Sequence, residues 1–145
     1  MSELEDLYQE TILDHGRRPR NFGKPDHFSH EAEGYNPLCG DRFTLYATIE
    51  DGVIQDVRFD GMGCAISTAS ASLMTEAMRG RPVEEFEGLF EGVHDLVRGM
   101  PPIGDIGKLI VFGGVSKFPM RVKCASLPWH TFKAALAGTR EVTTE

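Results

Sequence analysis

Apolar and polar residues alternate strictly in the middle of the chain, and this pattern predicts a β-hairpin. Residues 42–50 have the two-residue period of a half-buried strand. Asp51-Gly52 follows, a pair that favours positive φ at both positions of a tight turn. Residues 53–59 then return with the same period, and a further short strand is expected near residues 31–35. This part of the chain is therefore expected to form a small sheet.

Apolar residues recur every three or four positions elsewhere, which predicts amphipathic helices. We expect helices over residues 3–14, 65–78 and 83–97, a shorter one over 105–112, and a last one near Cys124. The apolar side of residues 83–97 is expected to face the core rather than a partner. Pro128 suits the first turn of the last helix, where its missing N–H costs nothing, whereas an earlier start would kink that helix.

Length and composition indicate a single globular domain. The chain has 145 residues, of which 41% are hydrophobic and 26% charged, enough to bury a core without disulfides. No linker, repeat or low-complexity tract divides it. We therefore predict one domain over residues 1–138, followed by a polar and frayed tail over 139–145.

The charge and the apolar runs exclude several kinds of partner. The net charge is −7 with no basic block, which argues against binding nucleic acid. The longest apolar runs, such as residues 109–112, are too short to span a bilayer. The acidic, amphipathic N-terminus does not resemble a signal peptide, so we expect a cytoplasmic protein with no membrane contact.

The three cysteines all fall at junctions between predicted elements. An odd number argues against a disulfide framework and favours metal, redox or sulfur chemistry in a reducing compartment. Cys39 lies in the turn before the hairpin, and Cys64 and Cys124 lie near the starts of helices. Because free amides at a helix N-terminus favour a thiolate, we expect Cys64 and Cys124 to have lowered pKa values.

Three thiolates leave one place at a four-coordinate zinc site. Asp41 lies two residues from Cys39 across a glycine and can reach the same point. The alternative is a histidine, of which His130 is nearest to Cys124 in sequence. Six residues along a helix correspond to about 240°, so His130 and Cys124 share a face poorly. The cysteine spacing alone matches no generic zinc ribbon.

Short motifs surround the cysteines and continue into the N-terminal segment. The residue sequence of these motifs resembles that of the IscU/SufU family of iron–sulfur assembly proteins over roughly residues 3–138. The matching segments are residues 7–15, 19–21, 36–41 (Asn-Pro-Leu-Cys-Gly-Asp), 61–67 (Gly-Met-Gly-Cys-Ala-Ile-Ser) and 121–125 (Arg-Val-Lys-Cys-Ala).

The resemblance implies an α+β fold, with a small antiparallel sheet of about three strands packed by helices. It places the family's site on Cys39, Asp41, Cys64 and Cys124. Members of this family bind zinc there, or assemble a [2Fe–2S] cluster from iron and sulfur. They receive the sulfur from a cysteine desulfurase that uses pyridoxal phosphate.

Three departures from the ISC-type scaffold favour the SufU branch. Lys123 stands where ISC-type members have a histidine before the third cysteine. The Leu-Pro-Pro-Val-Lys chaperone motif is replaced by residues 118–123. The stretch over 79–101 is longer than in ISC-type members and resembles the SufU insertion.

The resemblance to the SufU branch implies a zinc-dependent acceptor of persulfide sulfur, a sulfurtransferase-like accessory of a SufS-like desulfurase rather than a stand-alone enzyme. The same resemblance makes Cys39 the expected acceptor, and Gly40 beside it would let the turn move. Three thiolates and a carboxylate around Zn²⁺ sum to −2, so Arg121 and Lys123 are candidates for compensating charge.

The alternative is a scaffold that assembles a transient [2Fe–2S] cluster on the same residues and passes it to apo-proteins or other SUF components. Ligand type does not separate the two readings, because soft thiolates suit both zinc and iron–sulfur chemistry. A metallohydrolase is disfavoured, since it needs an open metal position with a general base beside it and the sequence has no H-E-x-x-H pattern.

Overall fold

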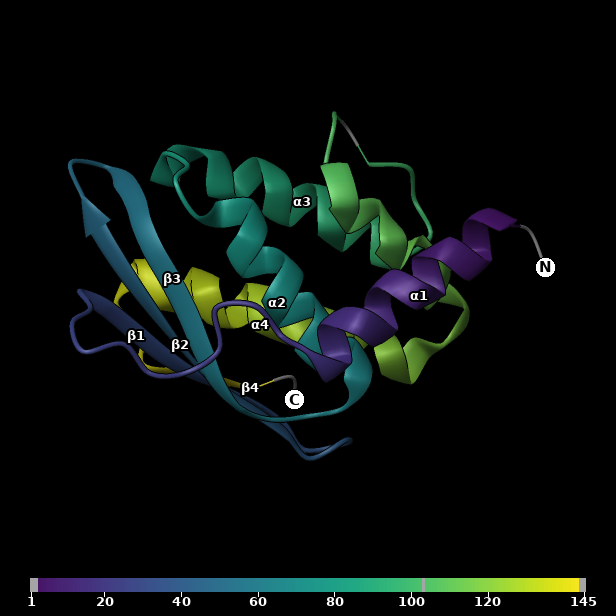
Figure 1. The fold of residues 1–145 in the computed structure, drawn as a ribbon, viewed down its shortest axis with the longest axis horizontal. Helices are drawn as coiled ribbons and strands as arrows, with labels where there is room; N and C mark the ends of the chain where they lie inside the picture. The colour runs from purple at the N-terminus through teal and green to yellow at the C-terminus, as the bar shows by residue number, and fades with distance from the viewer. Residues whose placement is uncertain (1–2, 103, 144–145) are drawn as a thin grey trace.

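The computed structural model describes residues 3–102 and 104–143, in which helices pack on one face of a four-stranded sheet (Figure 1). The strand order is β3-β2-β1-β4, with β4 parallel to β1 and the other pairs antiparallel. The α+β class predicted from the sequence is confirmed. The elements are α1 (Glu3–Arg17), β1 (His30–Asn36), β2 (Asp41–Glu50), β3 (Val53–Met62), α2 (Ala65–Met78), η1 (Val83–Glu85), α3 (Phe86–Val97), η2 (Gly107–Lys117), α4 (Pro119–Ala137) and β4 (Glu141–Thr143).

The predicted hairpin is present as β2 and β3. Asp51 and Gly52 have φ values of 52° and 74°, the left-handed conformation that a two-residue turn needs. A register shift between Thr48 and Ile49 interrupts the pairing. Strand β3 continues to Met62, three residues beyond the predicted end at residue 59, because Gly61 and Met62 still pair with β2.

The predicted frayed tail is wrong for residues 141–143. These residues form β4, which pairs in parallel with Glu33–Tyr35 of β1. Gly138 ends α4 in a left-handed conformation (φ 80°), which turns the chain back toward the sheet. The Glu33 N–H then donates to the carbonyl of Arg140 at 2.7 Å. The sheet therefore has a fourth strand, parallel to β1. The sequence of this short polar segment did not predict it.

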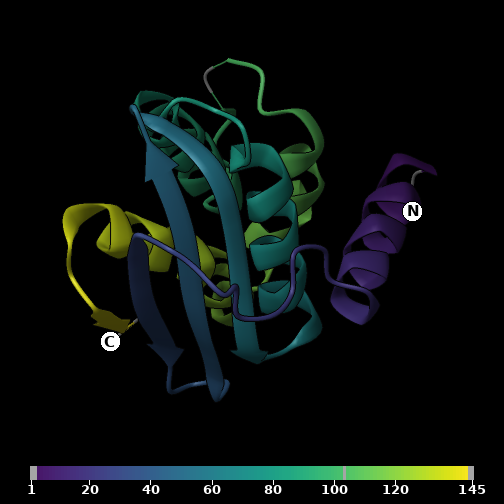
Figure 2. The ribbon, with the colours of Figure 1, turned by 60° about the vertical axis from the view of Figure 1, so that its left-hand side comes forward.

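Helices α2 and α4 cover one face of the sheet, as Figure 2 shows with the strands in front. Residues 18–29 cross the opposite face, where Phe28 packs on Tyr46 with ring centroids 5.0 Å apart. No helix among the described residues combines the length and apolar character that crossing a bilayer requires.

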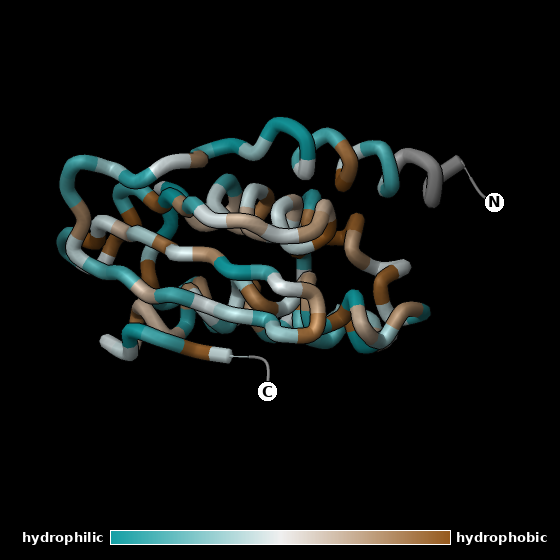
Figure 3. Tube along the Cα trace, turned by 90° about the horizontal axis from the view of Figure 1, so that it is seen from below, coloured by the Kyte–Doolittle hydropathy of each residue, from teal (hydrophilic) through white to brown (hydrophobic). Residues whose placement is uncertain are grey.

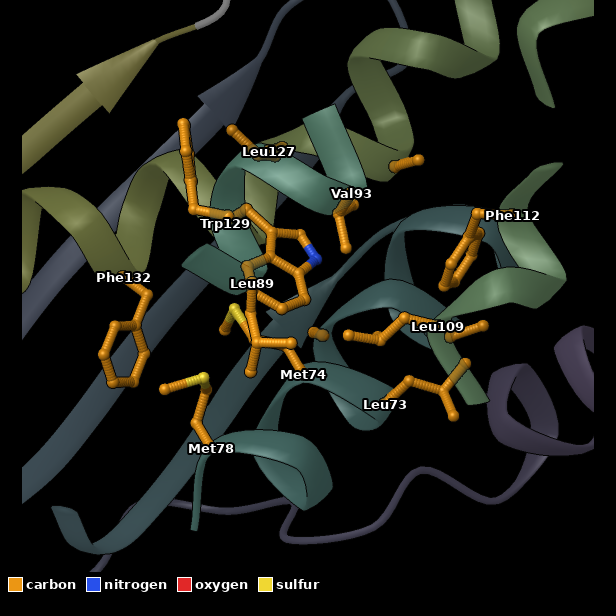
Figure 4. Packing of buried hydrophobic residues seen from close by; sticks show 14 of the residues in the cluster. Leu73, Met74, Met78, Leu89, Val93, Leu109, Phe112, Leu127, Trp129 and Phe132 are labelled. Carbon is orange, nitrogen blue, oxygen red and sulfur yellow. The ribbon is translucent and has the colours of Figure 1, made fainter. Parts of the chain in front are cut away.

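The core lies between the sheet and the helices. Figure 4 shows side chains from α2, α3, η2 and α4 meeting around Trp129. Phe86, the first residue of α3, stacks on Trp129 and Phe132 with ring centroids 6.0 and 5.0 Å apart. The stretch over residues 79–101 thus supplies core residues, and its apolar side faces inward as predicted.

Two helix boundaries differ from the predictions. The predicted helix over 105–112 is a 3₁₀ helix over Gly107–Lys117 that continues through Gly113-Gly114. Helix α4 begins at Pro119 rather than near Cys124, so Pro128 lies in its interior. Pro128 has no N–H to donate to the carbonyl of Cys124, four residues before it.

Helix α1 lies along one side of the molecule (Figure 3) and is fixed to α2 by a buried histidine. His15 is 2% exposed, and its Nδ1 lies 2.7 Å from the Ser72 hydroxyl. The Arg20 N–H donates to the same hydroxyl at 2.8 Å. Burial, with the Arg20 charge, lowers the pKa of His15. His15 therefore has a structural role outside the cysteine cluster.

The packing of Phe86 predicts a large loss of stability in the Phe86→Ala variant. Removing a buried phenylalanine costs about 3–5 kcal/mol, and denaturant unfolding of both proteins would measure it. Phe118→Ala is the matched control, because Phe118 is 60% exposed and its truncation should cost under about 0.5 kcal/mol. Equal losses in the two variants would contradict a core role for α3.

Candidate metal centre

Three chain segments bring the cysteines together at one end of the sheet. Cys39 lies in the turn between β1 and β2, Cys64 between β3 and α2, and Cys124 in α4. The Cys124 thiol donates to the Cys39 sulfur at 3.2 Å. Ligand atoms of Cys39, Asp41 and Cys124 all lie within 4.8 Å of one another. Cys64 lies outside this group, but it is near enough for Cys124 to lower its pKa.

Asp41 connects the segments through its buried carboxylate. It is the first residue of β2 and is 0% exposed. Its Oδ1 accepts from the backbone N–H of Cys64 at 2.8 Å, and its Oδ2 accepts from the amide of Asn36 at 3.2 Å. These hydrogen bonds are needed, because burying a carboxylate without hydrogen-bond partners costs folding free energy. The carboxylate therefore sets where Cys64 lies relative to the Cys39 turn.

Asn36 is a site residue to which the sequence analysis gave no role. It is fully buried at the end of β1. Its side-chain amide donates to Asp41 and lies 3.6 Å from the Cys124 sulfur, while its side-chain oxygen accepts from the Leu38 N–H at 3.3 Å. The sequence feature that could have indicated a role for Asn36 is its position before Pro37 in a turn, since a turn asparagine commonly accepts a hydrogen bond from the backbone N–H two residues further on.

Two glycines shape the turns that carry the thiols. Gly40 has φ of 72°, a left-handed conformation that closes the turn after Cys39 and disfavours other residues. At Gly63, a Cβ would lie 2.6 Å from the Phe43 ring and 2.5 Å from the Ser67 hydroxyl. The chain can therefore approach the core closely just before Cys64.

Cys64 caps the N-terminus of α2. Its sulfur accepts from the Ser67 N–H at 3.5 Å. Contact with the Cys124 thiol, together with the hydrogen bonds from Ser67, lowers the pKa of Cys64 to about 5. The predicted thiolate at a helix N-terminus is confirmed for this cysteine.

The same prediction is wrong for Cys124. Because α4 begins at Pro119, this residue lies in its second turn and is 0% exposed. The contact with the Cys64 thiolate, burial, and the contact with Cys39 raise the pKa of Cys124. Without a metal ion the pair is therefore asymmetric: Cys124 holds the proton and Cys64 carries the charge.

Arg121 and Lys123, the two candidates for compensating charge, are placed differently. A hydrogen bond with Cys124, with the charges of Cys64, Cys124 and Cys39, raises the pKa of Arg121. This guanidinium therefore stands beside the thiols. Lys123 is exposed on α4 and makes no ion pair with the described residues.

His130, the alternative ligand, lies in a different cluster. Its ring packs edge-on against Phe90 and His94, with centroids 5.2 and 6.2 Å away. It is absent from the group of ligand atoms formed by Cys39, Asp41 and Cys124. The described residues thus favour Asp41 over His130 as the fourth donor.

The donor set fits the groups that the sequence suggested. Three thiols and one carboxylate supply the four ligands that a closed zinc site takes. The same thiolates suit an iron–sulfur cluster. Asn36 and the Cys64 N–H hold the carboxylate by its outer hydrogen bonds, as partners of metal ligands commonly do.

Comparison with known proteins identifies the family. A model of the NifU-like N-terminal domain matches residues 7–125. The chain belongs to this family. It is 43% identical over 131 residues to an "Iron-sulfur cluster assembly scaffold protein IscU" of Thermotoga maritima, covering 90% of this chain and 92% of that protein. It is 37% identical over 138 residues to the "Zinc-dependent sulfurtransferase SufU" of Bacillus subtilis, covering 94% and 93%.

Solved structures show the same fold. A putative scaffold protein for the SUF system from Fervidobacterium islandicum superimposes with a TM-score of 0.84 at 36% identity, over 91% of this chain and 98% of that one. The resemblance to the IscU/SufU family is confirmed. Relatives of this chain carry both names, so the comparisons do not separate the two branches.

The capping position of Cys64 predicts a thiolate that titrates near pH 5 in chelator-treated protein. Ultraviolet absorbance of the thiolate against pH would measure it, and Cys64→Ser should abolish it. Because the pKa is lowered in the folded state, this group stabilises the fold fully above its unfolded pKa of about 8.5. That stabilisation is lost as the pH falls through about 5. A first thiolate that appears only above neutral pH would contradict this arrangement.

Proposed function

We propose that this protein accepts persulfide sulfur from a SufS-like, pyridoxal-phosphate-dependent cysteine desulfurase during iron–sulfur cluster assembly in the cytoplasm, with Cys39 as the acceptor. The observation that carries the proposal is the unequal placement of the clustered thiols. Cys124 is fully buried and the Cys64 sulfur caps a helix. Cys39 and Cys64 are both half-buried with exposed residues on either side, but the Cys64 sulfur is engaged by Ser67 at the start of α2, whereas Cys39 lies in the turn between two strands. Cys39 is therefore the half-buried thiol that is not held at a helix N-cap.

The transfer is a thiol exchange at sulfur. The Cys39 thiolate attacks the outer sulfur of the persulfide on the desulfurase, and a new sulfur–sulfur bond forms. The bond between the two sulfurs of the partner breaks, and the partner's cysteine leaves as a thiolate. The Arg121 guanidinium beside the cluster offsets negative charge there.

Cys39, Asp41, Cys64 and Cys124 would hold a zinc ion at this site. When bound, zinc supplies a redox-inert Lewis acid that keeps its ligands deprotonated. The Bacillus subtilis relative is named as a zinc-dependent sulfurtransferase, which supports this choice. Lys123 in place of histidine supports the SufU branch. So does the stretch over 79–101, which the chain uses to build part of its core.

Exposed apolar side chains next to the three cysteines support a protein partner. Leu38, Met62, Phe118 and Met120 are 56%, 80%, 60% and 58% exposed. Isolated apolar residues are ordinary on a surface, but a group around a reactive site marks an interaction surface. Of these residues, Phe118 also lines an apolar pocket of about 480 Å³, together with Tyr8, Ile66, Val115 and their neighbours.

A scaffold for a transient [2Fe–2S] cluster is the second candidate function. The cluster would use the same donors and pass to apo-proteins or other SUF components. The observation that favours it is the 43% identity to a relative named as an IscU scaffold protein.

The sulfur-transfer proposal predicts that the zinc-loaded protein increases sulfide release by its desulfurase in the presence of a reductant. Chelator-treated protein should lose most of this stimulation, because no metal ion keeps the Cys39 thiol deprotonated, and the Cys39→Ala variant should lose it because the acceptor thiol is missing. Sulfide measured against time, with the desulfurase alone as baseline, gives the result.

Ser126→Ala is the control for this experiment. Its hydroxyl donates to the carbonyl of Val122 in its own helix, so stimulation should stay at the wild-type level. Full stimulation by Cys39→Ala would contradict the proposal. An iron-dependent cluster spectrum that grows on the protein without stimulation would favour the scaffold function.

Asp41→Ala distinguishes the two functions further. In sulfur transfer, losing the carboxylate should lower stimulation, because it is both a ligand and the acceptor for the Cys64 N–H. In a scaffold, the variant should instead retain its cluster longer than wild type, as measured by the rate of cluster transfer to an apo-protein. Circular dichroism would confirm that the variant is folded, and unchanged values in both assays would contradict both roles of Asp41.

A further inference from the structure

The closest contact between two thiols of the site joins Cys39 and Cys124. Their sulfurs lie 3.2 Å apart, with the Cys124 thiol directed at the Cys39 sulfur. Forming a disulfide bond between them requires a closure of little more than 1 Å, since such a bond is about 2.05 Å long. Cys39 lies in a turn with a glycine beside it, whereas Cys124 is fixed within a helix. The turn is therefore the part that would move.

We propose that Cys124 resolves a persulfide carried on Cys39, releasing hydrosulfide and leaving a Cys39–Cys124 disulfide. This activity rests on the proposed function, because it starts from the persulfide that sulfur transfer places on Cys39. It gives the protein a second outcome for the sulfur it accepts: release as sulfide instead of onward transfer as sulfane sulfur.

Burial determines which sulfur of the persulfide is attacked. Cys124 is 0% exposed and lies behind the half-buried Cys39. Sulfur delivered by a partner arrives from the exposed side, so the outer sulfur of the persulfide points away from Cys124. The atom nearest to Cys124 is then the inner sulfur, the Cys39 Sγ itself. Attack there has the outer sulfur on the opposite side as the leaving group, which is the in-line arrangement that thiol exchange requires.

The step balances without an external oxidant. The Cys124 sulfur bonds to the Cys39 Sγ, and the bond between that Sγ and the outer sulfur breaks. The electron pair of the broken bond leaves with the outer sulfur, and the proton of the Cys124 thiol makes it hydrosulfide. The outer sulfur is reduced and the Cys124 sulfur is oxidised, whereas the Cys39 sulfur exchanges one sulfur–sulfur bond for another and keeps its oxidation state.

Cys64 is placed less well for this role. Its sulfur is held at the N-cap of α2, where the Ser67 N–H and hydroxyl lie 3.5 Å away. It does not join the group of ligand atoms that brings Cys39 and Cys124 together. Ser126→Ala is the control for Cys124→Ser, since the Ser126 hydroxyl lies in the same helix and donates to the carbonyl of Val122.

Metal binding would control the outcome. A zinc ion held by Cys124 occupies the electron pair that this residue needs for attack. The persulfide on Cys39 should then persist for transfer, whereas protein without the ion should release sulfide.

The test loads chelator-treated protein with inorganic polysulfide, removes the excess, and follows Cys39 by alkylation and peptide mass measurement. Wild type should yield the Cys39–Cys124 disulfide with one hydrosulfide per disulfide. In Cys124→Ser the mass of one added sulfur should persist on Cys39 about tenfold longer or more, because intramolecular attack is strongly favoured by proximity. Ser126→Ala should behave as wild type, and zinc added to wild type should prolong the persulfide.

Equal persulfide lifetimes in wild type and Cys124→Ser, or a disulfide that links Cys39 to Cys64, would overturn the resolving role. Peptide mapping of the wild type alone decides this point if a variant fails to fold. Loading with polysulfide does not use the desulfurase, so the two proposals fail separately. Resolution of the chemical persulfide without transfer from the desulfurase would overturn only the proposed function. Transfer to Cys39 without resolution would overturn only the role of Cys124.

Discussion

The arrangement of the site depends on one buried carboxylate. Asp41 starts β2, yet its two oxygens hold the N-cap of α2 and the last residue of β1. A buried charged group must find hydrogen bonds, so the segments that satisfy it cannot separate cheaply. Two cysteines are thereby fixed relative to each other before any metal ligation. The third comes from α4, whose position is set independently by the aromatic core around Trp129.

Three chemically identical side chains are differentiated by their surroundings. Cys64 is charged because contact with Cys124 and hydrogen bonds from Ser67 at the helix N-terminus lower the pKa of its thiol. Cys124 is protonated because burial and that neighbour disfavour its thiolate. Cys39 lies in a turn that a partner can approach. One cluster can therefore combine an acceptor, an anchor and an internal nucleophile, and a metal ion that binds all three would make them equivalent.

The sequence predicted the features that are encoded locally. Alternation and Asp-Gly specified the hairpin, and small-residue periodicity placed the start of α2 beside Cys64. The convergence of Cys39, Asp41 and Cys124 was expected from motif resemblance, because residues far apart in the chain meet only through the tertiary fold. The role of Asn36 was missed because its side chain acts on partners from three segments. The start of α4 was missed because packing carries the helix past Pro128, where local propensity favours a boundary.

The three residues of β4 affect how the sheet meets other chains. An unpaired strand edge presents a row of N–H and C=O groups that can template pairing with another molecule. Strand β4 covers the edge of β1 along Glu33–Tyr35, directly before the turn that carries Cys39. Because β4 is short, the outer edge it offers instead is too limited for extended pairing. The fold thus guards this edge of the sheet, beside the turn that carries Cys39, against self-association through strand addition.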